Sequence, residues 1–167
     1  MLDLGGIPLH SADRSAADTV VLVGGHCTYN PEPLADFVDA VVLGDGEEVV
    51  TEISSVVGRW KADGADRPAL LRSLAGIPGV YVPSLYEARF DGSLQVSLDP
   101  VDPEVPLIVE KRTVADLGEW PYPKNQLVPL TEVVHDRLNV EVFRGCTRGC
   151  RFCQAGMITR PVRERPA

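Results

Sequence analysis

Three cysteines lie within eight residues of one another near the C-terminal end of the chain, at Cys146, Cys150 and Cys153. Their spacing is Cys-x3-Cys-x2-Cys. Three thiolates spaced in this way can surround one corner of a cubane [4Fe-4S] cluster, which leaves the fourth iron without a protein ligand. An iron with an open position is a place for chemistry. The residue types and their spacing therefore predict a cluster site whose ligands are these three cysteines.

A zinc site is the alternative interpretation of the same cysteines. Structural zinc usually takes four ligands that come in pairs. No cysteine or histidine follows Cys153 in the remaining 14 residues, so His26, Cys27 or His135 would have to complete the site. The competing hypothesis is thus a non-enzymatic module that binds zinc or a partner. A disulfide framework is not favoured, because three of the four cysteines crowd together while Cys27 lies far upstream.

The segments around the cysteines predict a strand over 138–143, a loop over 145–153 and the start of a helix from Gln154. Further upstream, short apolar runs at 19–23 and 40–43 each end in glycine and predict two buried strands.

Helices are predicted between and after the upstream strands. Asn30-Pro31 predicts a short helix that ends at about Phe37. Apolar residues at helical spacing predict further helices over 47–60 and 68–74. This alternation indicates an α/β unit with a parallel sheet, in which the loops after the strands can face a ligand.

Glycines end both predicted strands, at Gly24-Gly25 and at Gly44. A nucleotide tail or a phosphate can approach a backbone without side chains, so these glycines are candidate cofactor contacts. The alternative is that they only allow the chain to turn.

The remaining segments carry weaker signals. Residues 1–18 are small and polar, and we expect them to be poorly ordered or to form only half of an element whose beginning is missing. Asp91-Gly92 predicts a hairpin between strands at 86–90 and 94–98. Six prolines interrupt 99–130, which we interpret as an extended linker.

Composition excludes several classes of function. The net charge of −8 argues against general binding to nucleic acid or to anionic membranes. No run of about 18 apolar residues is present to span a membrane, and the N-terminus lacks the pattern of a signal peptide. We therefore expect a cytoplasmic protein. No P-loop, nucleophile and base pair, or paired carboxylates stand out, so no catalytic residue is assigned.

The cysteine spacing, with Phe152 directly before the third cysteine, resembles that of the radical S-adenosylmethionine (radical SAM) superfamily. The resemblance implies that Cys146, Cys150 and Cys153 hold a [4Fe-4S] cluster and that Phe152 packs near the adenine of S-adenosylmethionine. It also implies that Gly145 and Gly149 let the loop turn tightly. In that superfamily the reduced cluster cleaves S-adenosylmethionine to methionine and a 5'-deoxyadenosyl radical, with an electron donor such as flavodoxin or ferredoxin.

A wider resemblance covers the strings at 24–35, 44–48 and 141–166, which are similar to bacterial radical SAM proteins with an N-terminal cobalamin (B12)-binding-like domain. It implies a partial Rossmann-like domain over 1–78, a hairpin and Pro-rich linker over 79–137, and the start of a (β/α) barrel over 138–167. The Asp-x-His-x-x-Gly motif of many cobalamin domains is absent from this chain. Cobalamin is therefore a possible additional cofactor that the residues do not assign.

The barrel of such an enzyme would need on the order of 200 further residues after the cysteine loop. The chain has 14 residues after Cys153, so we expect a fragment whose 167 residues alone do not turn over S-adenosylmethionine. The arginines after Cys153 either form a solvated face or, in an intact enzyme, contact a carboxylate or phosphate.

Overall fold

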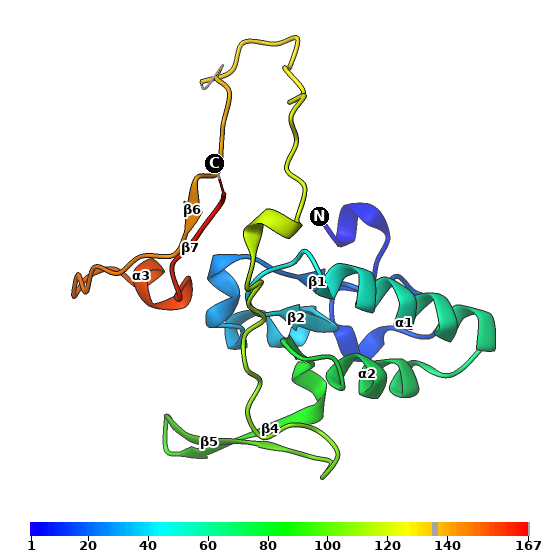
Figure 1. Cartoon of the computed structure of the whole chain (residues 1–167). Coiled ribbons are helices and arrows are strands. Elements are labelled where there is room, and N and C mark those ends of the chain that lie inside the picture. Colours follow the sequence, from blue (N-terminus) through cyan, green and yellow to red (C-terminus); the bar gives the residue numbers. More distant parts are fainter. Residues whose placement is uncertain (135–136, 167) are drawn as a thin grey trace. The chain divides into compact units, whose positions relative to one another are not determined.

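The computed structural model describes residues 1–134 and 137–166 of the chain (Figure 1). The chain divides into two compact units, Met1–Thr113 (unit 1) and Val114–Ala167 (unit 2). Both helices and small sheets are present, so the protein is a mixed α/β structure. Of the helices in the described residues, none combines the length and the apolar character needed to cross a membrane.

A three-stranded sheet of order β1-β2-β3 forms the centre of unit 1. Its strands are β1 (Leu22–Val23), β2 (Ala40–Val42) and β3 (Val80–Tyr81). β1 and β2 are parallel, whereas β3 pairs antiparallel with β2. Both predicted strands are thus confirmed, and the predicted parallel pairing is correct for them. The predicted burial holds for β2, whereas Leu22 of β1 is exposed and Val23 is half-buried. The prediction of a wholly parallel sheet is wrong, because β3 returns beside β2 in the opposite direction.

Both faces of this sheet are covered, as the continuous apolar runs of its strands predict. On one face Ala40 and Val80 pack with the helices in the larger core cluster. On the opposite face Val41 and Tyr81 form a second cluster with Val38. Successive residues of a strand point to opposite faces, so a short run such as Ala40-Val41 contributes to both clusters.

Two helices cover the first of these faces, and Figure 1 shows them side by side. They are α1 (Val49–Asp63) and α2 (Arg67–Ala75). Gly64 ends α1 in the left-handed conformation, and the side chain of Asp66 caps α2 by accepting a 2.8 Å hydrogen bond from the Ala69 amide. Both predicted helices are confirmed, with bounds that differ by one to three residues.

The remaining turns of unit 1 are short 3-10 segments. They are η1 (Asp3–Gly5), η2 (Ser11–Asp13), η3 (His26–Tyr29), η4 (Glu32–Phe37) and η5 (Pro83–Leu85). The predicted helix after Asn30 is therefore a 3-10 turn, in which the Leu34 amide bonds the Pro31 carbonyl at 2.9 Å. Pro33 within the segment lacks an N–H donor, which disfavours a regular α-helix.

The N-terminal segment is tied to the sheet, which corrects the expectation that residues 1–18 are poorly ordered. The guanidinium of Arg14 is buried and lies 3.0 Å from Asp39 Oδ2. It also donates to the carbonyls of Pro8, Leu9 and Phe37. Arg67 reaches the same Asp39 oxygen at 2.8 Å. A polar composition therefore did not indicate disorder, because one buried charge anchors the segment.

The predicted hairpin is confirmed as β4 (Tyr86–Asp91) and β5 (Leu94–Pro100), which pair antiparallel. Gly92 occupies the turn with a φ of 61°. Beyond the hairpin, residues 109–113 return to the sheet, and we call this segment the strap. The Arg112 amide donates to the Leu43 carbonyl at 2.8 Å, and the Asp45 amide donates to the Arg112 carbonyl at 3.0 Å. The strap thus adds a short parallel bridge at the end of β2.

Unit 2 contains few regular elements. They are η6 (Leu117–Glu119), β6 (Phe143–Arg144), α3 (Ala155–Ile158) and β7 (Arg163–Glu164). β6 pairs antiparallel with β7. The strand predicted over 138–143 is wrong for most of that range, because β6 shares only Phe143 with it and extends to Arg144. The loop and the following helix are confirmed. The first strand of a barrel remains a prediction, because these elements include one antiparallel pair and no parallel neighbour among the described residues.

Candidate functional site

The cysteine loop, residues 145–153, joins β6 to α3 in unit 2. Cys146 and Cys153 are partly buried, Cys150 is exposed, and all three thiols are free. The Cys153 amide donates to the Cys150 carbonyl at 3.0 Å, which makes a turn in the second half of the loop. The structure therefore places the three predicted ligands on one irregular segment between a strand and a helix.

The three thiols are not gathered around a common point. Among residues 1–134 and 137–166, no group of three or more His, Cys, Asp or Glu side chains is arranged to hold a metal ion. Each thiol is available as a ligand, and thiolates are the donors that iron–sulfur clusters take. The chemistry of the donor set fits a cluster, and the side chains would have to converge when one binds.

The first glycine of the loop allows close packing. Gly145 has a φ of 100°, in the region that favours glycine. A Cβ at this position would lie 2.6 Å from the Pro161 carbonyl oxygen and 2.9 Å from that of Thr159. The expected turn at Gly145 is thus confirmed. Glycine is needed there because residues 159–162 return along the chain and pack directly against its backbone. Gly149 has open space around it and does not have a positive φ, so it makes no comparable turn.

The returning segment, residues 159–163, contributes an arginine to the loop. Arg160 Nε donates to the Cys146 carbonyl at 3.1 Å, and Nη2 donates to the Arg148 carbonyl at 3.3 Å. Arg163 is buried and donates to the carbonyls of Pro161 at 3.1 Å and Thr159 at 3.4 Å. The expectation of a solvated arginine face is therefore wrong for Arg163.

A charge cluster lies next to the β6–β7 pair, around Glu141. Glu141 accepts hydrogen bonds from Arg144 at 2.9 Å and from Arg165 at 3.1 Å. The hydrogen bond from Arg144, opposed by partial burial and reinforced by Arg165, holds the pKa of Glu141 below its ordinary value. Arg165 also stacks over the Tyr122 ring at 5.2 Å. These arginines stabilise the strand that precedes the cysteines.

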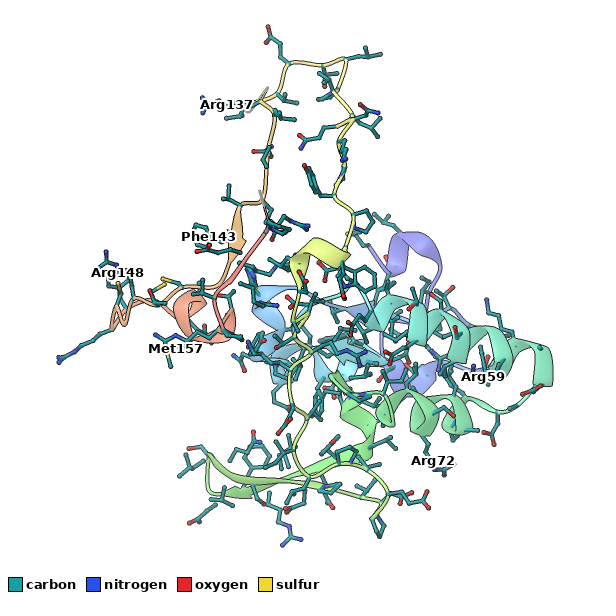
Figure 2. All side chains as sticks on the ribbon, viewed as in Figure 1. Arg59, Arg72, Arg137, Phe143, Arg148 and Met157 are labelled. Carbon is teal, nitrogen blue, oxygen red and sulfur yellow. The ribbon has the colours of Figure 1, made fainter. Side chains whose placement is uncertain are left out.

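The outer side of the loop is open. Phe152 is 92% exposed, so one face of its ring is free to stack on a planar ligand. Figure 2 labels Phe143 on β6, Arg148 on the loop and Met157 on α3, with Arg148 directed away from the strand pair. Arg151 is exposed as well.

The candidate cofactor glycines lie in unit 1 and differ in their surroundings. A Cβ at Gly25 would meet nothing within 4 Å, and one at Gly24 would meet only Val42 Cβ at 3.9 Å. At Gly44, in contrast, a Cβ would lie 2.7 Å from the Arg112 amide nitrogen and closer still to its carbonyl. The strap is a sufficient reason for glycine at position 44, whereas the space beside Gly24-Gly25 is free. Contact of any of the three with a cofactor remains a prediction.

The alternative ligands for zinc are distributed along the chain. Cys27 is exposed, with a free thiol, in η3 next to His26. His135 lies outside the described residues. The part of the chain that the structure describes shows no zinc site built from these residues.

Residue types alone did not reveal the supports of the loop. Gly156 in α3 is buried, and a Cβ there would lie 3.4 Å from the Arg148 carbonyl oxygen and 3.9 Å from Cys146 Cβ. Arg160, Arg163 and Gly156 follow the last cysteine within ten residues. That proximity was the available signal, but arginines bonded to backbone carbonyls have no characteristic spacing.

A family model described as radical SAM proteins, N-terminal, matches residues 1–83 of the chain. No curated protein and no solved structure matches the chain. The matched range covers the sheet and both helices of unit 1, and it does not include the cysteine loop. Two separate parts of the sequence, the N-terminal half and the Cys-x3-Cys-x2-Cys loop, thus point to the same superfamily, and the chain belongs to the radical SAM proteins.

Proposed function

We propose that Cys146, Cys150 and Cys153 bind a [4Fe-4S] cluster and that the protein acts in reductive cleavage of S-adenosylmethionine. The observation that carries this proposal is the presence of three free thiols on one loop between β6 and α3, in a chain that belongs to the radical SAM proteins. When bound, the cluster supplies the electron for that cleavage. The radical formed would act on a substrate that the residues do not identify.

Residues of the chain have separate parts in this proposal. The three cysteines bind iron as thiolates. The exposed ring of Phe152 stacks on the adenine of S-adenosylmethionine, because an apolar ring that is 92% exposed gains free energy when a planar ligand covers it. Gly145 lets the loop leave β6 sharply.

Unit 1 is the part of the chain that could bind a second cofactor. The parallel pair β1–β2 covered by α1 resembles the core of a Rossmann-like, cobalamin-binding-like domain. We propose that a cofactor, cobalamin among the candidates, would approach at Gly24-Gly25, where the backbone is open. We propose that Gly44, whose backbone forms a bridge with Arg112 of the strap, lies at the same end of the two strands and contacts the cofactor there.

Anaerobic reconstitution with iron and sulfide tests the cluster. The wild-type chain should acquire about four iron and four sulfide ions, with the visible absorption of a [4Fe-4S] centre and an electron paramagnetic resonance (EPR) signal after reduction. Cys146→Ser, Cys150→Ser and Cys153→Ser should each lose most of the iron. Cys27→Ser is the matched control, since it removes the one cysteine outside the loop and should retain the full cluster.

Metal analysis of anaerobically purified protein separates this function from a zinc module. Stoichiometric zinc without labile sulfide would overturn the proposal, as would a triple variant of the loop cysteines that keeps its cluster. Addition of S-adenosylmethionine to the reduced protein should alter the EPR spectrum if the open iron binds it.

A further inference from the structure

One guanidinium bonds two carbonyls in the first half of the cysteine loop. Arg160 donates to the carbonyl of Cys146 at 3.1 Å and to that of Arg148 at 3.3 Å. The two acceptors are separated by a single residue, Thr147, and they flank the stretch that leads from the first cysteine toward the second. Because the fork of an arginine is planar and rigid, two such bonds fix the direction of both carbonyls together.

The backbone next to Arg160 is itself fixed by a second arginine, Arg163. Arg163 donates to the carbonyls of Thr159 and Pro161, which are the residues on either side of Arg160. Its Nη1 also donates to the Val114 carbonyl at 2.7 Å, and its side chain is buried. Arg163 therefore fixes the backbone on both sides of Arg160, and this fixes the position from which the Arg160 side chain bonds the loop.

Two glycines allow these segments to approach each other. A Cβ at Gly145 would lie 2.9 Å from the Val162 Cα, and one at Gly156 would lie 3.4 Å from the Arg148 carbonyl oxygen. The returning segment thus packs against the start of the loop, and α3 packs against the carbonyl that Arg160 also bonds. Contacts from both sides leave residues 146–148 little freedom.

We propose that Arg160 is a positioning residue that holds residues 146–148 in one backbone conformation before the cluster binds. This inference rests on the proposed cluster function. Ordering a loop costs conformational free energy, and a loop that is ordered in advance lowers that cost at the moment of binding. The second half of the loop has its own turn between Cys150 and Cys153, so Arg160 supplies the order that the first half lacks.

The charge of Arg160 provides a rival explanation for the same effect. A cation beside the loop would favour thiolates and an anionic cluster whatever its shape. Lysine keeps the charge but lacks the planar fork that bonds two carbonyls together. Arg160→Lys therefore separates positioning from charge, and Arg160→Met removes both.

The test compares iron release from the reconstituted full chain to a chelator under anaerobic conditions. Arg160→Met and Arg160→Lys should both release iron about tenfold faster than wild type, as expected for loss of a partner that orients metal ligands. Arg151→Met is the matched control, because it removes an exposed arginine from the same loop and should release iron at the wild-type rate. The EPR line shape of the reduced cluster should change in both Arg160 variants and stay as in wild type in Arg151→Met.

Folding is checked separately through the β6–β7 pair. The Arg165 amide donates to the Val142 carbonyl at 2.9 Å, and its hydrogen exchange should stay slow in every variant. If Arg160→Met loses this protection, the milder Arg160→Lys decides the question.

Each result bears on one claim. Wild-type protein that holds no iron and sulfide overturns the cluster function, and the role of Arg160 with it. Iron release at the wild-type rate from both Arg160→Met and Arg160→Lys, with an intact cluster in the wild type, overturns the positioning role alone. Wild-type behaviour of Arg160→Lys with fast release from Arg160→Met would show that charge, and not positioning, is responsible.

Discussion

The Cα of Gly44 faces the backbone of Arg112, and a Cβ at position 44 would lie 2.7 Å from the Arg112 amide nitrogen. The two residues form a parallel bridge, with the Arg112 amide bonded to the Leu43 carbonyl at 2.8 Å. The strap therefore reaches the end of β2 only because residue 44 has no side chain. The Arg112 guanidinium also forms an ion pair with Glu48, at 3.0 Å.

We expect Gly44→Ala to destabilise unit 1 by about 2–4 kcal/mol, since it adds a steric clash to a backbone with a φ of 96°. Urea unfolding followed by Trp60 fluorescence, in a Trp120→Phe background, measures the change, because Trp60 is buried in the core of unit 1. Gly46→Ala is the control: a Cβ there meets nothing within 4 Å, and it should cost less than about 1 kcal/mol. Equal stability of the two variants would contradict the close approach of the strap.

Asp39 is the shared partner of Arg14 and Arg67 within unit 1, and all three side chains are nearly inaccessible to solvent. Asp39→Asn leaves two buried cations without their counter-charge, so unit 1 should lose about 3–5 kcal/mol. In Asp39→Asn, unit 1 should unfold at a lower urea concentration than in wild type. A protease should also cleave residues 1–18 faster.

An exposed ion pair provides the comparison for that variant. Arg89 and Asp99 lie 3.2 Å apart on the hairpin, with most of the Arg89 side chain in solvent. Arg89→Met should change stability by less than about 1 kcal/mol. A comparable loss in both variants would show that burial of Asp39 is not the cause.

Glu141 should make the stability of unit 2 depend on pH. Hydrogen bonds from Arg144 and Arg165 lower its pKa below the ordinary value of 4.5. The stabilisation is fully present above pH 4.5 and is lost as the pH falls through the lower pKa of the folded state. Glu141→Gln should remove this pH-dependent stabilisation and lower the free energy of unfolding of unit 2 by about 1 kcal/mol at pH 7. Hydrogen exchange of the Arg165 amide between pH 3 and pH 7, corrected for intrinsic rates, checks it; an unchanged pH profile in Glu141→Gln would oppose the assignment.

Tyr81 should remain protonated in alkaline solution. Its hydroxyl donates to Glu32 at 2.7 Å, and burial, together with that carboxylate, raises the pKa of Tyr81 well above its ordinary value of 10. Because the unfolded chain loses this proton more readily, unit 1 should lose stability as the pH rises above 10.

Absorbance at about 295 nm, where tyrosinate absorbs, follows this titration in the folded protein. Tyr81→Phe should delete the tyrosine whose pKa is raised by burial and by Glu32, and it should cost about 1 kcal/mol at neutral pH through the lost hydrogen bond. Tyr122→Phe is a control in unit 2. Ionisation of Tyr81 in the ordinary range would show that it is not buried against Glu32.

Local patterns in the sequence were sufficient for several elements and for the candidate ligands. The apolar spacing of residues such as Ile53 and Trp60 predicted α1, and Asp91-Gly92 predicted the hairpin, because both depend on interactions between near neighbours. Cys146, Cys150 and Cys153 stood out by residue type and spacing, and the superfamily that they suggested is the one whose N-terminal model matches residues 1–83.

Tertiary structure decided what depends on residues far apart in the chain. The antiparallel return of β3, the order of residues 1–18 around Asp39, and the strap at Gly44 all join segments separated by 20 residues or more. In the loop, spacing named the cysteines, but only the folded chain shows Arg160 bonded to the carbonyls of Cys146 and Arg148. A backbone carbonyl is the same in every residue, so a side chain that binds one leaves no mark in the sequence of its partner.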